Sequence, residues 1–307
     1  MIMKILFTDS QIIDQGDIDW TPIEKHGRFT NFKNLDRSEV TSGQAFSEAE
    51  AVFVDGFELD REMIQHAPNL KFIGAAATGF NNIDVDFARE KGIAVCNVPA
   101  YSTEAVAQHA AALMLSLACR IGGFDRQVKD GLWNNVNGTA YEMLPITLLD
   151  GKSIGIIGYG NIGKRMAQIA QALGMKVNVY SKDPEAAIKS DVVSLHCPLT
   201  EDNAGMVDED FISKMKDGAI LINTARGGLI DSGSVAEALR SGKLSGCGVD
   251  VLSPEPPEAD DPLLTAPNCI ITPHVAFTPV EIRQRVVDIC GENLESFING
   301  GRLNRID

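Results

Sequence analysis

A glycine pattern halfway along the chain limits what this sequence can fold into more than any other stretch. Residues 154–163 read Ile-Gly-Ile-Ile-Gly-Tyr-Gly-Asn-Ile-Gly, so Gly158, Gly160 and Gly163 follow an apolar run typical of a β-strand. The residues after the turn favour a helix whose apolar face consists of Ile162, Met166, Ile169, Ala170 and Leu173. In such a unit the first glycine makes the turn, the second lets backbone approach a pyrophosphate, and the third packs helix on strand. The pattern predicts an α/β domain with a nucleotide at the helix N-terminus.

The composition limits the remaining choices. A chain of 307 residues is long enough for two domains, and its net charge of −15 argues against binding nucleic acid. No apolar run approaches the length of a membrane span, and the first residues read as a strand rather than a signal peptide. The six cysteines show no metal-ligand spacing, so we expect no metal site and a reducing, cytoplasmic location.

The first hundred residues alternate short apolar strands with helical stretches, which predicts a parallel α/β unit. The expected strands lie near residues 3–8, 51–54, 71–75 and 93–96. A break at 97–102 follows, and Ser102 is the expected N-cap of an Ala/Leu-rich helix that runs to about Arg120. Residues 121–150 read either as an arm for subunit contacts or as a surface loop.

A second α/β series begins at residue 151. Its strands are expected near 154–158, 176–180, 191–196, 219–223, 246–250 and 269–272. Thr278-Pro-Val-Glu281 then predicts a capping box with proline at the first helical position, and a helix that runs nearly to the end of the chain.

Polar residues that follow the later strands are the candidates for chemistry, because open parallel sheets bind ligands at the carboxyl ends of their strands. Arg226 follows the strand at 219–223, Asp250 and Glu255 follow the strand at 246–250, and His274 follows the strand at 269–272. Each residue alone is more often a surface, loop or structural group. Together, and downstream of a nucleotide fingerprint, they indicate an active site.

At these residues the chain resembles the D-isomer-specific 2-hydroxyacid dehydrogenases over nearly its whole length, and most of all the glycerate dehydrogenase/hydroxypyruvate reductase members. The matching segments are Ala-Thr-Gly-Phe-Asn-Asn-Ile-Asp (77–84), Asn-Val-Pro-Ala-Tyr-Ser-Thr-Glu-Ala-Val-Ala-Gln-His (97–109), the glycine turn, Ser-Leu-His-Cys-Pro-Leu-Thr (194–200), Asn-Thr-Ala-Arg-Gly (223–227), the Asp250–Glu255 loop and Thr-Pro-His (272–274).

The resemblance implies an α/β fold of two Rossmann-like domains, one flavodoxin-like and one dinucleotide-binding, with parallel sheets and an interdomain cleft. The substrate-binding (catalytic) domain would comprise residues 1–99 and 284–307, and the dinucleotide-binding domain residues 100–283. The expected activity is hydride transfer between a nicotinamide cofactor and a small D-2-hydroxy acid or 2-oxo acid, with hydroxypyruvate or glyoxylate favoured.

Catalytic and substrate-binding roles follow from the same resemblance. Arg226 would bind the carboxylate and carbonyl oxygen of the 2-oxo acid, since its donor fork matches that planar group. Backbone amides near Thr78 and Gly79 would hold the same carboxylate. His274 would give a proton to the carbonyl oxygen as hydride arrives, and Glu255 would hydrogen-bond the imidazole and favour its protonated form.

The resemblance also implies a set of cofactor contacts, with Asp250 near the nicotinamide. The cofactor-binding residues would be Thr78, Gly158, Gly160, Asn161, Ile162, Gly163, Ser181, Lys182, Cys197, Pro198, Thr224, Ala225 and Asp250. We expect structural roles for His109 and His196, and Tyr101 reads equally as a cleft residue and as a packing residue.

The sequence departs from the NAD pattern at the ribose end. An acidic residue usually ends the second strand, about 20 residues past the fingerprint. Here that place holds Ser181, followed by Lys182, and Asp183 supplies the acid only if the strand end is shifted. Losing the carboxylate removes repulsion against a 2′-phosphate and the lysine adds attraction, so NADP stays open, while the resemblance keeps NAD slightly favoured.

The second departure is the short link at 181–190, where the family places a further strand and a helix. A parallel crossover takes a dozen or more residues, so this link is too short for the full unit. We therefore expect the outermost strand of the sheet to be missing, either by a true deletion or because the supplied sequence lacks a segment.

A cofactor-sensing interaction protein resembling the corepressors on this scaffold is the alternative to an enzyme. The expected partners are a small 2-oxo or 2-hydroxy acid and, from the 121–150 segment and family habit, a second copy in a homodimer. Neither nucleic acid nor a membrane is expected.

Overall fold

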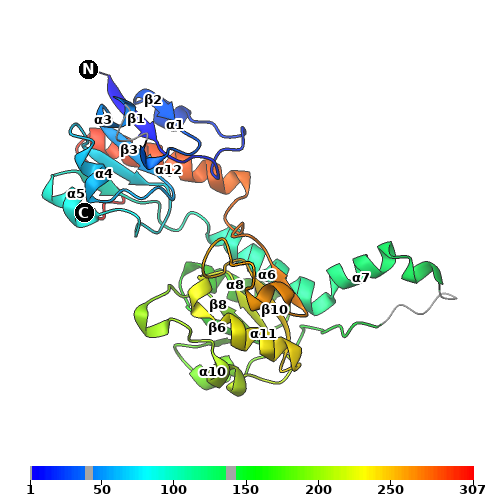
Figure 1. Cartoon of the computed structure of the whole chain (residues 1–307). Helices are drawn as coiled ribbons and strands as arrows, with labels where there is room; N and C mark the ends of the chain where they lie inside the picture. The colour runs from blue at the N-terminus through cyan, green and yellow to red at the C-terminus, as the bar shows by residue number, and fades with distance from the viewer. Residues whose placement is uncertain (1, 39–43, 136–142) are drawn as a thin grey trace. The chain divides into compact units, whose positions relative to one another are not determined.

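The chain forms two compact α/β units, seen in a computed structural model that describes residues 2–38, 44–135 and 143–307 (Figure 1). The first unit contains residues 1–102 and 277–307, and the second contains residues 103–276. The boundaries expected from the sequence lie after residue 99 and before residue 284. The assignment of substrate and cofactor binding to the units stays a prediction.

The first unit is built on a parallel sheet with the strand order β2-β1-β3-β4-β5, which is the flavodoxin-like order. Its strands are β1 (Met3–Phe7), β2 (Gly27–Asn31), β3 (Ala51–Val54), β4 (Phe72–Ala75) and β5 (Ala94–Cys96). Only β2 was not predicted. It is an edge strand whose residues are partly buried or exposed, so it lacks the apolar run of the inner strands.

Both faces of this sheet are covered by helices. They are α1 (Thr21–Glu24), α3 (Gln44–Ser47), α4 (Arg61–Gln65), α5 (Val85–Glu90) and α12 (Val280–Ile298). Val52 and Val54 of β3 pack in one core cluster with residues of α4 and α5. Ala51 and Phe53 point to the other face and pack with residues of α12, which Figure 1 shows beside the N-terminal strands.

The start of α12 differs by one residue from the predicted capping box. The helix begins at Val280 and its N-cap is Pro279, whose carbonyl accepts from the amides of Ile282 and Arg283. The proline therefore lies outside the helix rather than at its first position.

The second unit contains a six-stranded parallel sheet with the order β11-β10-β9-β8-β6-β7. Its strands are β6 (Ser153–Ile157), β7 (Lys176–Val179), β8 (Val192–Leu195), β9 (Ala219–Asn223), β10 (Leu244–Val249) and β11 (Cys269–Ile271). All six lie close to the predicted ranges.

Helices also cover both faces of the second sheet, and two core clusters fill the layers. The helices of this unit are α6 (Thr103–Cys119), α7 (Ile121–Lys129), which has no buried residue, α8 (Asn161–Ala172), α9 (Pro184–Ile188), α10 (Glu209–Lys214) and α11 (Ser232–Arg240), with 3-10 turns η1 (Leu132–Asn135), η2 (Glu201–Asn203), η3 (Gly227–Leu229) and η4 (Pro262–Thr265). The predicted apolar face of α8 is confirmed, because its five residues all pack in one cluster.

The link between β7 and β8 contains the short helix α9 and no strand, so β7 is the last strand on its side of the sheet in the described chain. Asn178 holds this link, donating to the carbonyl of Ala186 and to the hydroxyl of Ser190. The link also crosses β6 closely, since a Cβ on Gly155 would collide with the backbone of Ala187. The missing outer strand is therefore confirmed.

The helix α7, which follows α6, contains no buried residue. Among the described residues no single helix is long and apolar enough to cross a membrane, although α6 and α7, which meet at a 57° bend, pass that test as a pair.

Candidate functional site

Five neighbouring strands of the second sheet end in register, so the residues after them share one edge. Ile157 pairs with Leu195, Leu195 with Asn223, Asn223 with Val249, and Val249 with Ile271. The residues that follow these strands are Gly158, His196, Thr224, Asp250 and Thr272. Nearly every candidate site residue of the second unit lies at these strand ends or in the loops that follow them.

The glycine turn has the geometry that a pyrophosphate site needs. Gly158 has a φ of +95°, and a Cβ there would collide with the backbone of His196 and Cys197. A Cβ on Gly163 would collide with the carbonyl of Gly158, so this residue brings α8 close to β6. Gly160 is the N-cap of α8 and has no side chain to occupy the first-turn amides. Asn161 is exposed at that helix start, whereas Ile162 packs in the core.

A dinucleotide also fits the polar groups at the ends of β8 and β9. The Thr224 hydroxyl and His196 Nδ1 are buried and have no partner among the described residues, which is the state expected of groups that face a ligand. Cys197 and Ala225 pack partly against the core, and Pro198 is exposed. Burial lowers the pKa of His196 to about 4 and raises that of the Cys197 thiol, so His196 is neutral at physiological pH.

Arg226 is held at the sheet edge by the loop that it stands on. Asn223 is fully buried, and its side chain donates to the Arg226 carbonyl and accepts from the Ala225 amide. A Cβ on Gly227 would collide with the backbone of Leu252, so this loop lies directly against the one after β10. The Arg226 side chain is exposed, and one of its nitrogens donates to the Ala225 carbonyl.

His274 and Glu255 form the pair that the sequence predicts. His274 Nδ1 lies 2.7 Å from Glu255 Oε2, and the amide of Leu252 donates to Glu255 Oε1. The two side chains are 42% and 38% exposed, so a small molecule can reach them. With Nδ1 engaged by a carboxylate, the ring is fixed in the orientation used by an acid–base histidine.

Asp250 is 1% exposed and accepts hydrogen bonds from its own unit. Its Oδ1 accepts from the Thr272 hydroxyl and the Val275 amide, and its Oδ2 accepts from the Ala276 amide. These bonds anchor the loop that carries His274. Contact between Asp250 and a nicotinamide stays a prediction.

At the expected ribose end, Ser181 and Lys182 follow β7 and are exposed. Asp183, the other acid considered for that role, is the N-cap of α9 and accepts from the amide of Ala186. The Asp183 carboxylate therefore caps the helix in the link between β7 and β8.

Thr78 and Gly79 belong to the first unit, where they follow β4 and are exposed. The Thr78 hydroxyl donates to the carbonyl of Val98. Sequence reasoning gave no role to Asn223 or Thr272, although both carry a signal that could have found them: a polar side chain at the end of an apolar strand.

Comparison with known proteins identifies the family. Residues 111–276 match the family described as "D-isomer specific 2-hydroxyacid dehydrogenase, NAD binding domain". A hydroxypyruvate reductase of Blautia hydrogenotrophica is 41% identical over 323 residues, which cover 99% of this chain and 100% of that protein. The aligned length exceeds the 307 residues of this chain by 16, so the relative contains residues that this chain lacks.

Two solved structures have the same fold as this chain over nearly its whole length. An acyclic imino acid reductase in complex with NADPH and D-Arg has a TM-score of 0.85 and 30% identity, and the match covers 99% of this chain and 100% of that chain. A D-lactate dehydrogenase from Aquifex aeolicus, complexed with NAD and lactic acid, has a TM-score of 0.81 and 31% identity, with 98% of both chains covered. The chain therefore belongs to the D-isomer-specific 2-hydroxyacid dehydrogenases and is an NAD(P)-dependent oxidoreductase of that family.

Proposed function

We propose that this enzyme reduces a small 2-oxo acid, hydroxypyruvate or glyoxylate, to the 2-hydroxy acid, of D configuration where that product is chiral, with Arg226, Glu255 and His274 as its catalytic residues. The observation that carries the proposal is the 2.7 Å contact between His274 Nδ1 and Glu255 Oε2, on loops beside the one that holds Arg226. The relative named hydroxypyruvate reductase supports the choice of substrate.

In this mechanism each side chain has one task. The Arg226 guanidinium binds the substrate carboxylate through two parallel hydrogen bonds. A nicotinamide cofactor held at the glycine turn of Gly158, Gly160 and Gly163 would supply the hydride. His274 Nε2 gives a proton to the carbonyl oxygen in the same step and removes it in the reverse direction, while Glu255 fixes the ring by accepting from Nδ1.

A panel of carbonyl compounds tests this function. We expect NADH oxidation with hydroxypyruvate and glyoxylate, and none with glycolaldehyde, which lacks the carboxylate that Arg226 binds. Arg226→Lys loses the two-pronged contact, so kcat/KM should fall about 100-fold or more. A folded protein that turns over no 2-oxo acid would contradict the proposal.

We propose that the enzyme prefers NAD and also accepts NADP. The description of the matched family supports NAD. The exposed Ser181 and Lys182 support acceptance of a 2′-phosphate, because a hydroxyl and a cation stand where the usual acid would be, and Asp183 is the N-cap of α9. Titration should give Kd values for NADH and NADPH within about tenfold, and Lys182→Ala should weaken NADPH alone. A preference for NADH above 100-fold would contradict dual use.

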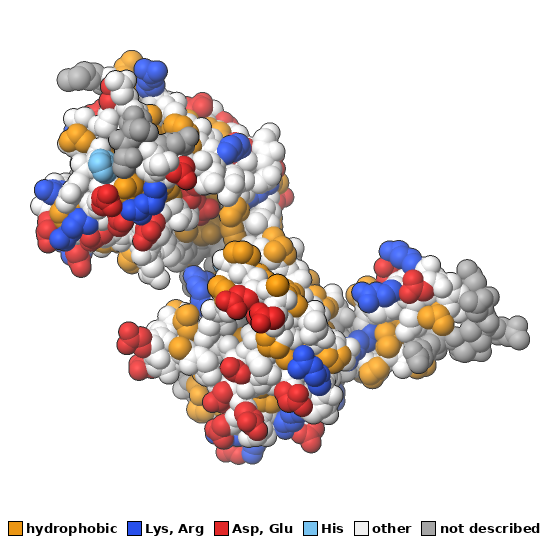
Figure 2. All heavy atoms as spheres, in the orientation of Figure 1, with side chains coloured by type: hydrophobic (Ala, Val, Ile, Leu, Met, Phe, Trp, Pro, Cys, Tyr) orange, Lys and Arg blue, Asp and Glu red, His pale blue; other side chains and the backbone are white. Residues whose placement is uncertain are grey.

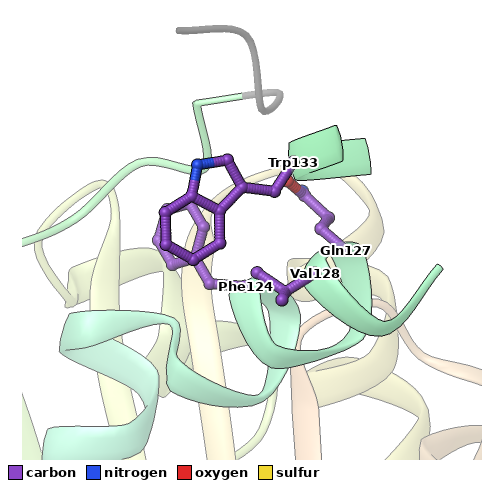
Figure 3. A pocket seen from close by; sticks show the side chains of 4 residues that line it. All are labelled: Phe124, Gln127, Val128 and Trp133. Carbon is purple, nitrogen blue, oxygen red and sulfur yellow. The ribbon is translucent and has the colours of Figure 1, made fainter. Parts of the chain in front are cut away.

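We propose a homodimer formed through the segment after α6. Among its described residues, the exposed apolar side chains are Ile121, Val128, Leu132, Trp133, Met143, Ile146 and Leu148. Figure 3 shows Trp133 leaning over Phe124 and Val128 of α7, and Figure 2 shows hydrophobic side chains along this segment. Seven exposed apolar residues in one short segment are typical of a surface that a partner covers.

A cytoplasmic location is also proposed, since six free cysteines, with Cys119 exposed, fit a reducing compartment. The compared proteins are described as enzymes or by an enzyme family, and they give the corepressor-like alternative no support.

A further inference from the structure

The loop that carries His274 adopts a backbone conformation that must be held by its surroundings. His274 has a φ of +53°, in the left-handed region that residues other than glycine seldom adopt. Its amide donates to the carbonyls of Asp250 and Thr272. The orientation of the imidazole therefore depends on the groups that fix residues 272–276.

The carboxylate of Asp250 is the centre of that support. It is buried and accepts from Thr272, Val275 and Ala276, which flank His274 on both sides. The Thr272 hydroxyl to Asp250 Oδ1 distance is 2.5 Å, as expected for an O–H donor on a carboxylate.

The same hydroxyl connects this carboxylate to α6. Thr272 Oγ1 lies 2.9 Å from His109 Nε2. A threonine hydroxyl has one proton, and a carboxylate only accepts, so the Thr272 proton is used on Asp250. The remaining bond requires His109 Nε2–H as the donor to Thr272, and the same nitrogen lies 3.4 Å from Asp250 Oδ1.

We propose that His109 and Thr272 are positioning residues for the reaction, acting through Asp250 to hold His274 in its productive orientation. The relay joins two distant parts of the second unit. His109 is in α6, whose first residue, Thr103, is where the chain enters that unit, and Ala276 is where the chain leaves it. One buried carboxylate thereby fixes the loop of His274 against the helix that begins at the other boundary. The inference rests on the role proposed above for His274.

Matched substitutions separate this role from general stability. Thr272→Val keeps the shape but removes the hydroxyl, and Thr272→Ser restores it. His109→Leu removes the donor, and His109→Gln restores an N–H near the position of Nε2. The assay is hydroxypyruvate reduction by the full chain, with NADH binding measured by fluorescence titration and the fold checked by circular dichroism.

We expect Thr272→Val and His109→Leu each to lower kcat about tenfold or more, with the Kd for NADH changed less than about threefold. Thr272→Ser and His109→Gln should recover most of the lost kcat. The double variant should be no slower than the slower single variant, because both break one relay. Wild-type kcat in Thr272→Val, or additive losses in the double variant, would overturn the relay.

Two further measurements test the relay even if one of these variants fails to fold. The imidazole ¹⁵N shifts of His109 in the wild-type protein should show a proton on Nε2, and the Nδ1–H tautomer would overturn the relay. The variant His274→Ala separates a failure of the role proposed for His274 from a failure of the relay alone. Full activity in that variant overturns the role of His274 and the relay with it, whereas an inactive His274→Ala beside a fully active Thr272→Val overturns the relay alone.

Discussion

At the scale of single residues, the carboxyl edge of the first sheet contains a carboxylic acid with an unusual environment. Asp55 follows β3 and lies near Asp9, whose own carboxylate accepts from the amides of Asp55, Gly56 and Phe57. Burial, and then the charge of Asp9, raises the pKa of Asp55 to about 7. The folded protein therefore binds a proton here that the unfolded chain releases near pH 4.

This shift predicts how stability depends on pH. Between about pH 4 and 7 the native state holds more protons than the unfolded state, so the free energy of unfolding falls as pH rises, by up to about 1.4 kcal/mol per pH unit. Asp55→Asn should lose this slope and be more stable than the wild type at pH 8. Denaturant unfolding at pH 5 and pH 8 measures the difference.

The control is Asp217→Asn, which removes an exposed carboxyl whose pKa is lowered by Lys243. It should keep the slope between pH 5 and 7. Equal slopes for the wild type and Asp55→Asn would show that Asp55 is ionised in the fold.

At the scale of elements, the short link between β7 and β8 packs closely against the neighbouring strand β6. Gly155 in β6 has no room for a side chain, because the backbone of Ala187 in α9 occupies that place. Gly155→Ala should thus lower the free energy of unfolding by about 1–3 kcal/mol. In Gly122→Ala of α7 the new methyl meets no atom within 4 Å, and helix propensity should make that variant equal to or more stable than the wild type. Equal stability of both variants would mean that the link can shift.

The elements also show what could be predicted from the sequence. Strands such as β9 and β6 are largely apolar runs, so local pattern was sufficient to place them. The same pattern put Arg226, Glu255 and His274 after strand ends, and their roles stay predictions. The edge strand β2 has no such run, and the N-cap of α12 is set by one backbone conformation. The bond between His109 and Thr272 joins residues 163 positions apart, and only the fold brings them together.

At the scale of the whole molecule, the proposed dimer makes a direct prediction about assembly. Trp133 is 60% exposed in the described chain and lies over Phe124 at the apolar surface of α7. Trp133→Glu places a charge in the proposed interface, so we expect the mass from light scattering to fall from that of two chains toward one. Trp20→Phe, inside the first unit, should leave the assembly unchanged. A wild-type protein with the mass of one chain would contradict the dimer.

We propose that this family member transfers a proton through His274 and that its second unit binds the cofactor. The most direct measurement is steady-state NADH oxidation by His274→Ala with hydroxypyruvate, together with the Kd for NADH. We predict that kcat falls about 100- to 10,000-fold, the contribution expected of a general acid, while NADH affinity changes less than about threefold. A kcat within tenfold of the wild type would contradict proton transfer by His274.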